Sequence, residues 1–218
     1  ETFSKQGKQD NMSNIITLSN HKGGVGKTTS VINLGAGLVR LGKKVLLVDL
    51  DPQANLSQSL GYRDQELTIY GALKGEQEVK PIEVLPGLEL VPSTLDLAGA
   101  EIELSAEAGR EFILKELLEP LRASYDYIII DSPPSLGLLT INAFTASNEV
   151  LIPLQSQYLA LQGLTVLQGV IEKIQKRLNK GLKLGGVFIT QYDKRKVLHR
   201  EVLQTIQGHL KGLLLKTI

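Results

Sequence analysis

Short apolar segments alternate along the chain with longer segments whose apolar residues recur at helical spacing. The short segments are rich in β-branched and other aliphatic residues and show little polar alternation, so they are predicted to be strands. They are residues 15–19, 44–49, 88–93, 127–131, 149–154, 185–190 and 213–218. Continuous apolar runs of this kind are typical of parallel strands that are buried on both faces.

The segments between these strands are predicted to be helices. They are residues 27–41, 96–105, 110–122, 136–146, 161–178 and 197–209. Alternating strands and helices predict an α/β fold, a doubly wound, mostly parallel sheet with helices on both faces. No repeat or low-complexity linker interrupts the pattern, so residues 13–218 are predicted to form a single domain.

The two ends of the chain carry expectations of their own. We expect residues 1–12 to be a poorly ordered extension, either native or added to the natural chain, because they are polar and lie outside the pattern. We expect the C-terminal end of the domain to be incomplete, because no helix follows the last predicted strand.

Composition narrows the class of protein. The chain has 218 residues, 42% hydrophobic and 22% charged, with a net charge of +1, which is ordinary for a globular domain. It has no cysteine, which excludes disulfides, thiolate zinc sites and cysteine-ligated iron–sulfur clusters. No apolar run approaches the roughly 20 residues of a transmembrane helix, and the first residues lack the apolar core of a secretory signal. We therefore expect a cytoplasmic protein with no membrane partner.

The segment "SNHKGGVGKTTS", residues 19–30, joins a predicted strand to a predicted helix, which is the context of a phosphate-binding loop. Its glycines allow backbone N–H groups to approach phosphate oxygens, and the start of the helix adds a favourable dipole. We expect Lys27 to reach the β- and γ-phosphates, Thr28 to bind Mg²⁺ and Thr29 to bond the α-phosphate. The predicted nucleotide-binding residues are Lys22, Gly23, Gly24, Val25, Gly26, Lys27, Thr28 and Thr29.

Lys22 departs from the usual G-x-x-x-x-G-K-[ST] pattern, which has glycine where His21 stands and no lysine after it. The sequence K-G-G-x-G-K-T-T resembles the deviant Walker A motif of the ParA/MinD family of dimeric P-loop ATPases. That resemblance implies that Lys22 contacts phosphate across an ATP-sandwich dimer. It would then neutralise charge on a nucleotide bound mostly by the other subunit.

Three aspartates follow predicted strands. "VLLVDLDPQANLS", residues 45–57, resembles the D-x-D-P-Q segment of ParA-type proteins, which implies that Asp51 positions or activates the attacking water. Asp49 is interpreted either as a magnesium ligand or as a structural group. "YIIID" ends in Asp131 and resembles a Walker B segment, whose aspartate holds Mg²⁺ through a water.

Residues 172–200 concentrate positive charge, with nine Lys and Arg and two acids. Such a basic patch on a nearly neutral protein indicates contact with a phosphate backbone. Aromatic residues are few there, which favours duplex DNA over base-stacked single strands. The candidate DNA contacts are Arg195, Lys196 and Arg200; Arg195 also rests on the resemblance of "GVFITQYDKR" to the ParA family.

The resemblance covers residues 15–218 and is strongest to ParA/Soj-type proteins. It implies an enzyme that hydrolyses ATP with Mg²⁺, forms an ATP-dependent homodimer and binds non-specific DNA of the nucleoid. It also implies a ParB-type adaptor that stimulates hydrolysis, and a role in plasmid or chromosome partition. Two alternatives share the same machinery, a positioning ATPase for a protein cargo and a MinD-like membrane switch in division-site placement. A P-loop kinase is a further alternative, but it gives Lys22 no task.

Overall fold

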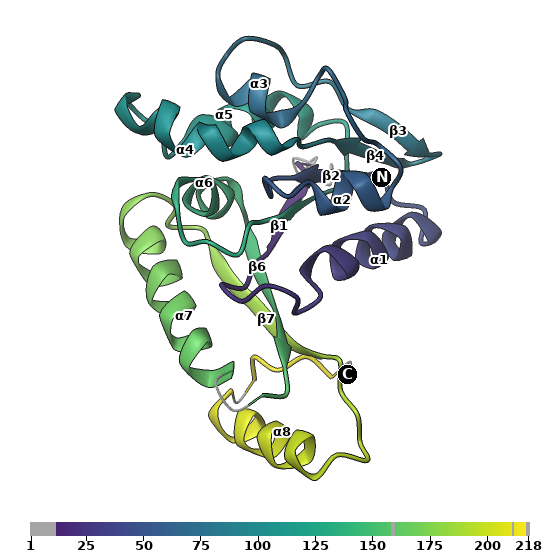
Figure 1. Ribbon diagram of the computed structural model, residues 1–218, viewed down its shortest axis with the longest axis vertical. Helices are drawn as coiled ribbons and strands as arrows, with labels where there is room; N and C mark the ends of the chain where they lie inside the picture. The colour runs from purple at the N-terminus through teal and green to yellow at the C-terminus, as the bar shows by residue number, and fades with distance from the viewer. Residues whose placement is uncertain (1–11, 158–159, 211, 217–218) are drawn as a thin grey trace, which may run out of the picture.

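The computed structural model describes residues 12–157, 160–210 and 212–216. Its centre is a seven-stranded sheet in the order β3-β4-β2-β5-β1-β6-β7, in which β3 is antiparallel to β4 and the other neighbours are parallel (Figure 1). The strands are β1 (Asn14–Leu18), β2 (Val45–Asp49), β3 (Ile82–Leu85), β4 (Leu88–Val91), β5 (Tyr127–Asp131), β6 (Glu149–Gln155) and β7 (Lys183–Thr190). The predicted doubly wound, mostly parallel sheet is confirmed.

The sheet is covered on both faces, and β2 shows how its sequence achieves this. Its side chains alternate, so Val45 and Leu47 pack in a core with the helix α1 (Lys27–Arg40), whereas Leu46 and Val48 pack in the core on the other face. All of these β2 residues are fully buried. A strand buried on both faces needs apolar residues at every position, which explains the lack of polar alternation in its sequence.

The two faces carry different helices. The α1 face also holds the short helix α2 (Asn55–Ser59), through the buried Leu56. The other face carries α3 (Ile69–Leu73), α4 (Ala100–Glu103), α5 (Ile113–Leu118), α6 (Leu138–Ala146), α7 (Ala160–Arg177) and α8 (Val197–His209). Figure 1 shows α1 on one side of the central strands and α6 and α7 on the other, with α8 beyond the end of β7.

Several predicted elements differ from the structure. The helices expected at 96–105 and 110–122 are α4 and α5, each shortened and flanked by 3₁₀ turns, η1 (Leu95–Gly99), η2 (Leu104–Ala106) and η3 (Glu119–Leu121). The strand expected at 213–218 is reduced to an isolated bridge between Val187 and Leu214, and its last two residues lie outside the described part of the chain. The expectation for residues 1–11 also falls outside it.

Strand order decides where polar residues meet. In the parallel register Asp131 of β5 lies beside Leu18 of β1 and beside Asp49 of β2. The segments that follow these strands therefore emerge at the same end of the sheet, where ligands bind in doubly wound folds. Across the described ranges, no helix is both long enough and apolar enough to span a bilayer.

Candidate nucleotide-binding site

The glycine-rich loop leaves β1 and enters α1 through backbone conformations that favour glycine. Gly24 has φ +71° and Gly26, the residue before the helix, has φ +90°. A Cβ atom on Gly23 or Gly24 would meet no protein atom within 4 Å. The loop thus borders open space at the amino end of a 14-residue helix, which is a ready-made anion site.

Side chains from β6 and β7 fix the orientation of the loop's peptide groups. The Gly24 carbonyl accepts hydrogen bonds from the side-chain amides of Gln155 (3.0 Å) and Gln191 (2.9 Å). The Val25 carbonyl accepts one from the Thr190 hydroxyl (2.7 Å). Because a trans peptide directs its N–H opposite its C=O, the N–H groups that follow these carbonyls face away from the glutamines. The loop is therefore held with donors on its free side.

Lys27 is buried beneath the loop, only 7% exposed. Its Nζ lies 3.5 Å from the Lys22 carbonyl oxygen, to which it donates. Burial lowers the pKa of Lys27 below its ordinary value, and the charges of Asp131 and Asp51 oppose that shift. The cation therefore lies close to carboxylates contributed by β5 and by the segment that follows β2.

Asp131 and Thr28 form a direct contact between β5 and the start of α1. The Thr28 hydroxyl donates to Asp131 Oδ2 at 2.6 Å, while Asp131 Oδ1 is buried without a hydrogen bond. Burial is the main cause that raises the pKa of Asp131 to about 7, and the Thr28 hydrogen bond acts against it. A buried carboxylate oxygen without a partner, beside a threonine hydroxyl, fits the oxygen ligands that Mg²⁺ prefers.

No cluster of three or more His, Cys, Asp and Glu side chains is arranged as a metal cage within residues 12–157, 160–210 and 212–216. This fits Mg²⁺ in nucleotide sites, which uses one or two carboxylates together with substrate phosphates and waters.

Asp49 is fully buried, and both of its carboxylate oxygens accept hydrogen bonds from the chain. Its Oδ2 accepts from the backbone N–H (2.8 Å) and the hydroxyl (2.7 Å) of Ser57, and its Oδ1 accepts from the Asp51 N–H (3.3 Å). Burial raises the pKa of Asp49 to about 6, against the effect of these hydrogen bonds. Asp49 thereby ties the end of β2 to α2.

Asp51 is 7% exposed and less tightly bound than Asp49. Its Oδ1 accepts a hydrogen bond from the Gln53 N–H at 2.9 Å. Its charge acts on both Lys27 and Asp131, so the structure brings together the three residues from the loop, β5 and the segment after β2. The sequence predicted this grouping.

Lys22 bonds to glutamine side chains at and just after the end of β6. Its side chain is exposed, and its Nζ donates to Gln155 Oε1 (3.4 Å) and to Gln157 Oε1. Its backbone N–H donates to Asn20 Oδ1 at 3.0 Å. The two lysines of the loop thus differ in environment, since Lys27 is buried near the aspartates and Lys22 faces outward at the end of β6.

The basic span 172–200 does not form one patch, which corrects the expectation from sequence. Lys173 and Arg177 lie in the last turns of α7, before β7, whereas Lys196 and Arg200 follow β7 at its other end. An eight-residue strand separates the two groups by roughly 23 Å. Figure 1 shows the same separation, with α8 far from the end of α7 that leads into β7.

The group after β7 lies at the same end of the sheet as the phosphate loop, because β1, β6 and β7 are parallel. We call Lys194, Arg195, Lys196 and Arg200 the α8 basic cluster; all four are exposed. Arg195 is engaged by Asp193, with Nε–Oδ1 and Nη2–Oδ2 distances of 3.0 Å. Arg200 donates through Nη1 to the Lys194 carbonyl at 3.2 Å. Part of the cluster's charge is therefore already paired within the chain.

Comparison with known proteins identifies the family of this chain. Residues 13–184 match a family model described as an AAA domain. The chain is 45% identical over 210 residues to the chromosome-partitioning ATPase Soj of Treponema pallidum, covering 95% of this chain and 83% of that protein. It is 46% identical over 212 residues to the sporulation initiation inhibitor protein Soj of Bacillus subtilis, covering 95% and 84%. The chain belongs to the Soj/ParA family of chromosome-partitioning ATPases.

Solved structures with the same fold carry the ligands that the loop predicts. Cobyrinic acid a,c-diamide synthase from Mycobacterium smegmatis, with bound ADP and magnesium, superposes with a TM-score of 0.87 at 41% identity, covering 92% of this chain and 83% of that one. A putative plasmid partition protein from Borrelia burgdorferi B31, bound to AMPPNP, gives 0.80 at 32% identity and covers 94% and 84%. The expectation of a Soj/ParA-type P-loop ATPase that uses ATP and Mg²⁺ is confirmed at the level of the family.

Sequence reasoning missed the residues that hold this Soj/ParA-type loop and the Asp51 segment in place. They are Ser57, Ser93, Gln155, Thr190 and Gln191. A signal was available for four of them, because Ser93, Gln155, Thr190 and Gln191 stand at or just after the carboxyl ends of predicted strands, where ligand sites form. Ser57 gave no such signal, and its contact with Ser93 joins segments 36 residues apart.

Proposed function

We propose that this chain is a Mg²⁺-dependent ATPase whose ATP-bound form pairs two copies, binds DNA without sequence preference and drives partition of a plasmid or chromosome. The observation that carries the proposal is the contrast between its two loop lysines. Lys27 is buried near Asp131 and Asp51, whereas Lys22 is exposed and bonds to Gln155 and Gln157. One active site uses the first cation directly and leaves the second for another subunit.

The loop residues hold the nucleotide. Backbone N–H groups of residues 23–29 face the phosphates, Lys27 neutralises the β- and γ-phosphates, and Thr29 bonds the α-phosphate. Thr28 and Asp131 would hold Mg²⁺, Asp131 through a water. The ion supplies charge neutralisation at the phosphates. The unpartnered Asp131 Oδ1 supports this assignment.

Asp51 orients the attacking water and accepts its proton as the water oxygen bonds to the γ-phosphorus; the bond from that phosphorus to the bridging oxygen breaks, and ADP leaves. Its carboxylate is anchored at one oxygen only, by Gln53, which supports this role. Asp49 holds the segment that carries Asp51, and its saturated oxygens favour the structural role over that of a magnesium ligand.

Lys22 acts on the nucleotide of the partner copy in the dimer. When two copies close over ATP, its ammonium leaves the side-chain oxygens of Gln155 and Gln157 and binds phosphate oxygens instead. A cation supplied in this way stabilises the charge that develops in phosphoryl transfer and couples hydrolysis to dimerisation.

The α8 basic cluster binds the duplex backbone. Its exposed guanidinium and ammonium groups lie at the end of the sheet where ATP would bind. This position supports DNA binding that depends on the bound nucleotide. Pairing of two copies doubles this charge. A ParB-type adaptor stimulates hydrolysis, which separates the copies and releases them from the nucleoid.

The test is binding of the protein to random-sequence duplex DNA with ATP, with ADP and without nucleotide, at two salt concentrations. Wild type, Lys22→Ala and Lys80→Ala are compared; Lys80 is an exposed lysine near β3, far from the loop in the sheet order. We expect salt-sensitive binding that requires ATP, is lost in Lys22→Ala and persists in Lys80→Ala.

Other outcomes decide between the remaining functions. Absence of DNA binding in every nucleotide state would exclude the partition role and direct the test to liposomes. Binding that ignores both nucleotide and Lys22 would show a basic surface without a switch. ATP turnover of the same samples, with and without a ParB-type adaptor, reports on the enzyme separately from DNA binding.

A further inference from the structure

Two buried serines join the ends of β2 and β4 behind the nucleotide site. The Ser57 hydroxyl donates to Asp49 Oδ2 at 2.7 Å and accepts from the Ser93 N–H at 2.9 Å. The Ser93 hydroxyl donates to the main-chain carbonyl of Asp51 at 3.0 Å. Ser57 is fully buried and Ser93 is 4% exposed, so water does not compete for these bonds.

These contacts close a ring around Asp51. The Asp51 N–H donates to Asp49 Oδ1 (3.3 Å) and the Asp51 carbonyl receives the Ser93 hydroxyl, so the backbone of Asp51 is held on both sides of its Cα. The direction in which the Asp51 side chain leaves the backbone follows from these two peptide groups. The ring therefore sets where its carboxylate lies relative to Lys27.

We propose that Ser93, acting through the Asp51 backbone, is a positioning residue for ATP hydrolysis. The inference rests on the proposed role of Asp51 as the residue that orients the attacking water. Ser93 contacts neither phosphate nor metal. It acts by keeping the Asp51 carboxylate aligned, and a misplacement of about 1 Å in such a group costs up to about 100-fold in rate.

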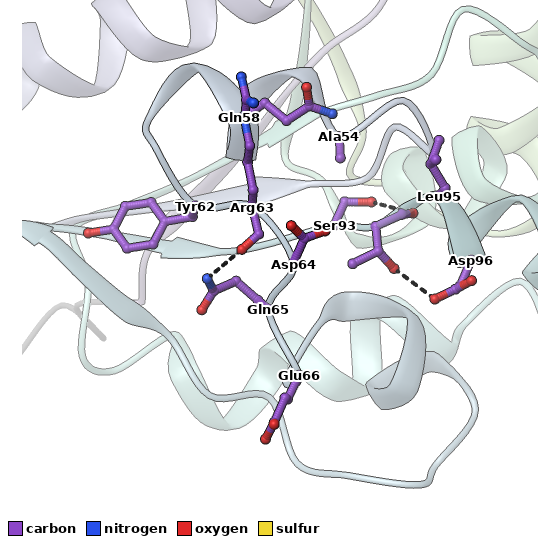
Figure 2. A pocket seen from close by; sticks show the side chains of 11 residues that line it. Ala54, Gln58, Tyr62, Arg63, Asp64, Gln65, Glu66, Ser93, Leu95 and Asp96 are labelled. Carbon is purple, nitrogen blue, oxygen red and sulfur yellow. Dashed lines mark hydrogen bonds between the residues drawn. The ribbon is translucent and has the colours of Figure 1, made fainter.

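Ser93 can be altered without disrupting the fold. In Ser93→Ala the Asp51 carbonyl keeps the hydrogen bond from the Ala54 N–H (2.9 Å), and Ser57 keeps the Ser93 N–H, so no buried group is orphaned. Ser93 also lines a cavity of about 440 Å³ (Figure 2). Ser93→Thr retains the hydroxyl at a position that borders this cavity.

The experiment compares steady-state ATP hydrolysis and ADP affinity in wild type and variants. For Ser93→Ala we expect kcat to fall roughly tenfold or more, with KM for ATP and Kd for ADP changed by less than about twofold, because the phosphate loop is not touched. Ser93→Thr retains most of the wild-type kcat. Ser59→Ala, an exposed serine in the same short helix as Ser57, is the matched control and retains full activity.

A second comparison asks whether Ser93 acts through Asp51. In an Asp51→Asn background, adding Ser93→Ala should lower residual kcat by less than about twofold, because residues that act as one unit are non-additive. An undiminished further loss would overturn the inference, as would full activity of Ser93→Ala in the wild-type background. Equal losses of kcat and nucleotide affinity, or failure of Ser93→Thr to restore kcat, would also overturn it.

The outcome for the proposed function is read separately. Wild-type protein without ATP turnover, or Asp51→Asn with wild-type turnover, refutes the catalytic assignment itself. If turnover is lost in Asp51→Asn but unchanged in Ser93→Ala, the proposed ATPase function is supported and the positioning role of Ser93 is refuted.

Discussion

Two regions of the molecule carry charge in different environments. One is the nucleotide site at the ends of β1, β2 and β5, and the other is the segment that follows β7. At the first, Asp49, Asp131 and Lys27 are at most 7% exposed, and both aspartates accept short hydrogen bonds from hydroxyl groups. After β7, the Arg195 side chain is 86% exposed, and its partner is a neighbour in sequence, Asp193. Burial makes each charge at the first site expensive to leave unpaired, whereas water screens the second.

The largest expected effect is at the buried cation. Lys27→Ala removes the charge that faces the phosphates and leaves Asp51 and Asp131 without their nearby counter-charge. We expect ATP turnover to fall by at least the roughly 100- to 1000-fold that one lost transition-state contact costs, and nucleotide affinity to fall as well. Turnover assays and fluorescent ATP titration measure both. Near-normal turnover in Lys27→Ala would place catalysis elsewhere.

The sequence predicted the first site well for a physical reason. Parallel strands bring their carboxyl ends together, so residues that end apolar runs meet in space, as Asp49 and Asp131 do. It missed β3 because Ile82 to Leu85 alternates between half-buried and exposed positions on the antiparallel edge strand. It missed α2 and α3 because five residues are too few to show helical periodicity.

The second region was misjudged because closeness in sequence was taken for closeness in space. Lys173 and Arg200 both lie in one basic stretch, but β7 carries the chain from one end of the sheet to the other between them. Nothing in the charge pattern marks that crossing. The Ser57–Ser93 contact was missed for the opposite reason: the two residues are distant in sequence but close in space, and such a hydrogen bond leaves no periodic pattern in the sequence.

A second prediction concerns the pH dependence of stability at Asp49. Its folded-state pKa is raised from 3.8 to about 6, so the folded state binds more protons than the unfolded state between these values. The resulting stability is present at low pH and is lost as the pH rises through about 6. Relative to Asp49→Asn, the wild-type free energy of unfolding should therefore fall by about 1 kcal/mol between about pH 5 and pH 8.

Urea unfolding of both proteins without nucleotide or metal measures this difference. The Asp49→Asn reference removes the contributions of groups that do not interact with the Asp49 carboxylate. A difference that stays constant across the pH range, or grows in favour of wild type at high pH, would show that Asp49 is not a buried acid with a raised pKa.

The third prediction separates the two basic groups. Arg200→Glu and Lys173→Glu reverse one exposed charge each, at opposite ends of β7. Because only the α8 basic cluster is proposed to meet DNA, Arg200→Glu should weaken ATP-dependent DNA binding and lower the slope of log affinity against log salt by about 1. Lys173→Glu should leave the slope unchanged. Equal losses of DNA affinity in the two variants would indicate that both basic groups contact DNA, as the sequence suggested.

The smallest effect is expected at the exposed ion pair. Asp193 holds the Arg195 guanidinium through two oxygens, and this partner keeps the pKa of Asp193 below its usual value. Binding of a DNA phosphate by Arg195 must compete with that carboxylate. In Asp193→Asn the competing charge is removed, so DNA affinity with ATP should rise, by about two- to threefold at low salt and less at high salt, since exposed charges are screened. Adding Arg195→Ala tests the route of the effect. The gain should disappear in the double variant, because the freed guanidinium is then absent; a gain that survives would mean that Asp193 repels DNA directly and does not act by restraining Arg195.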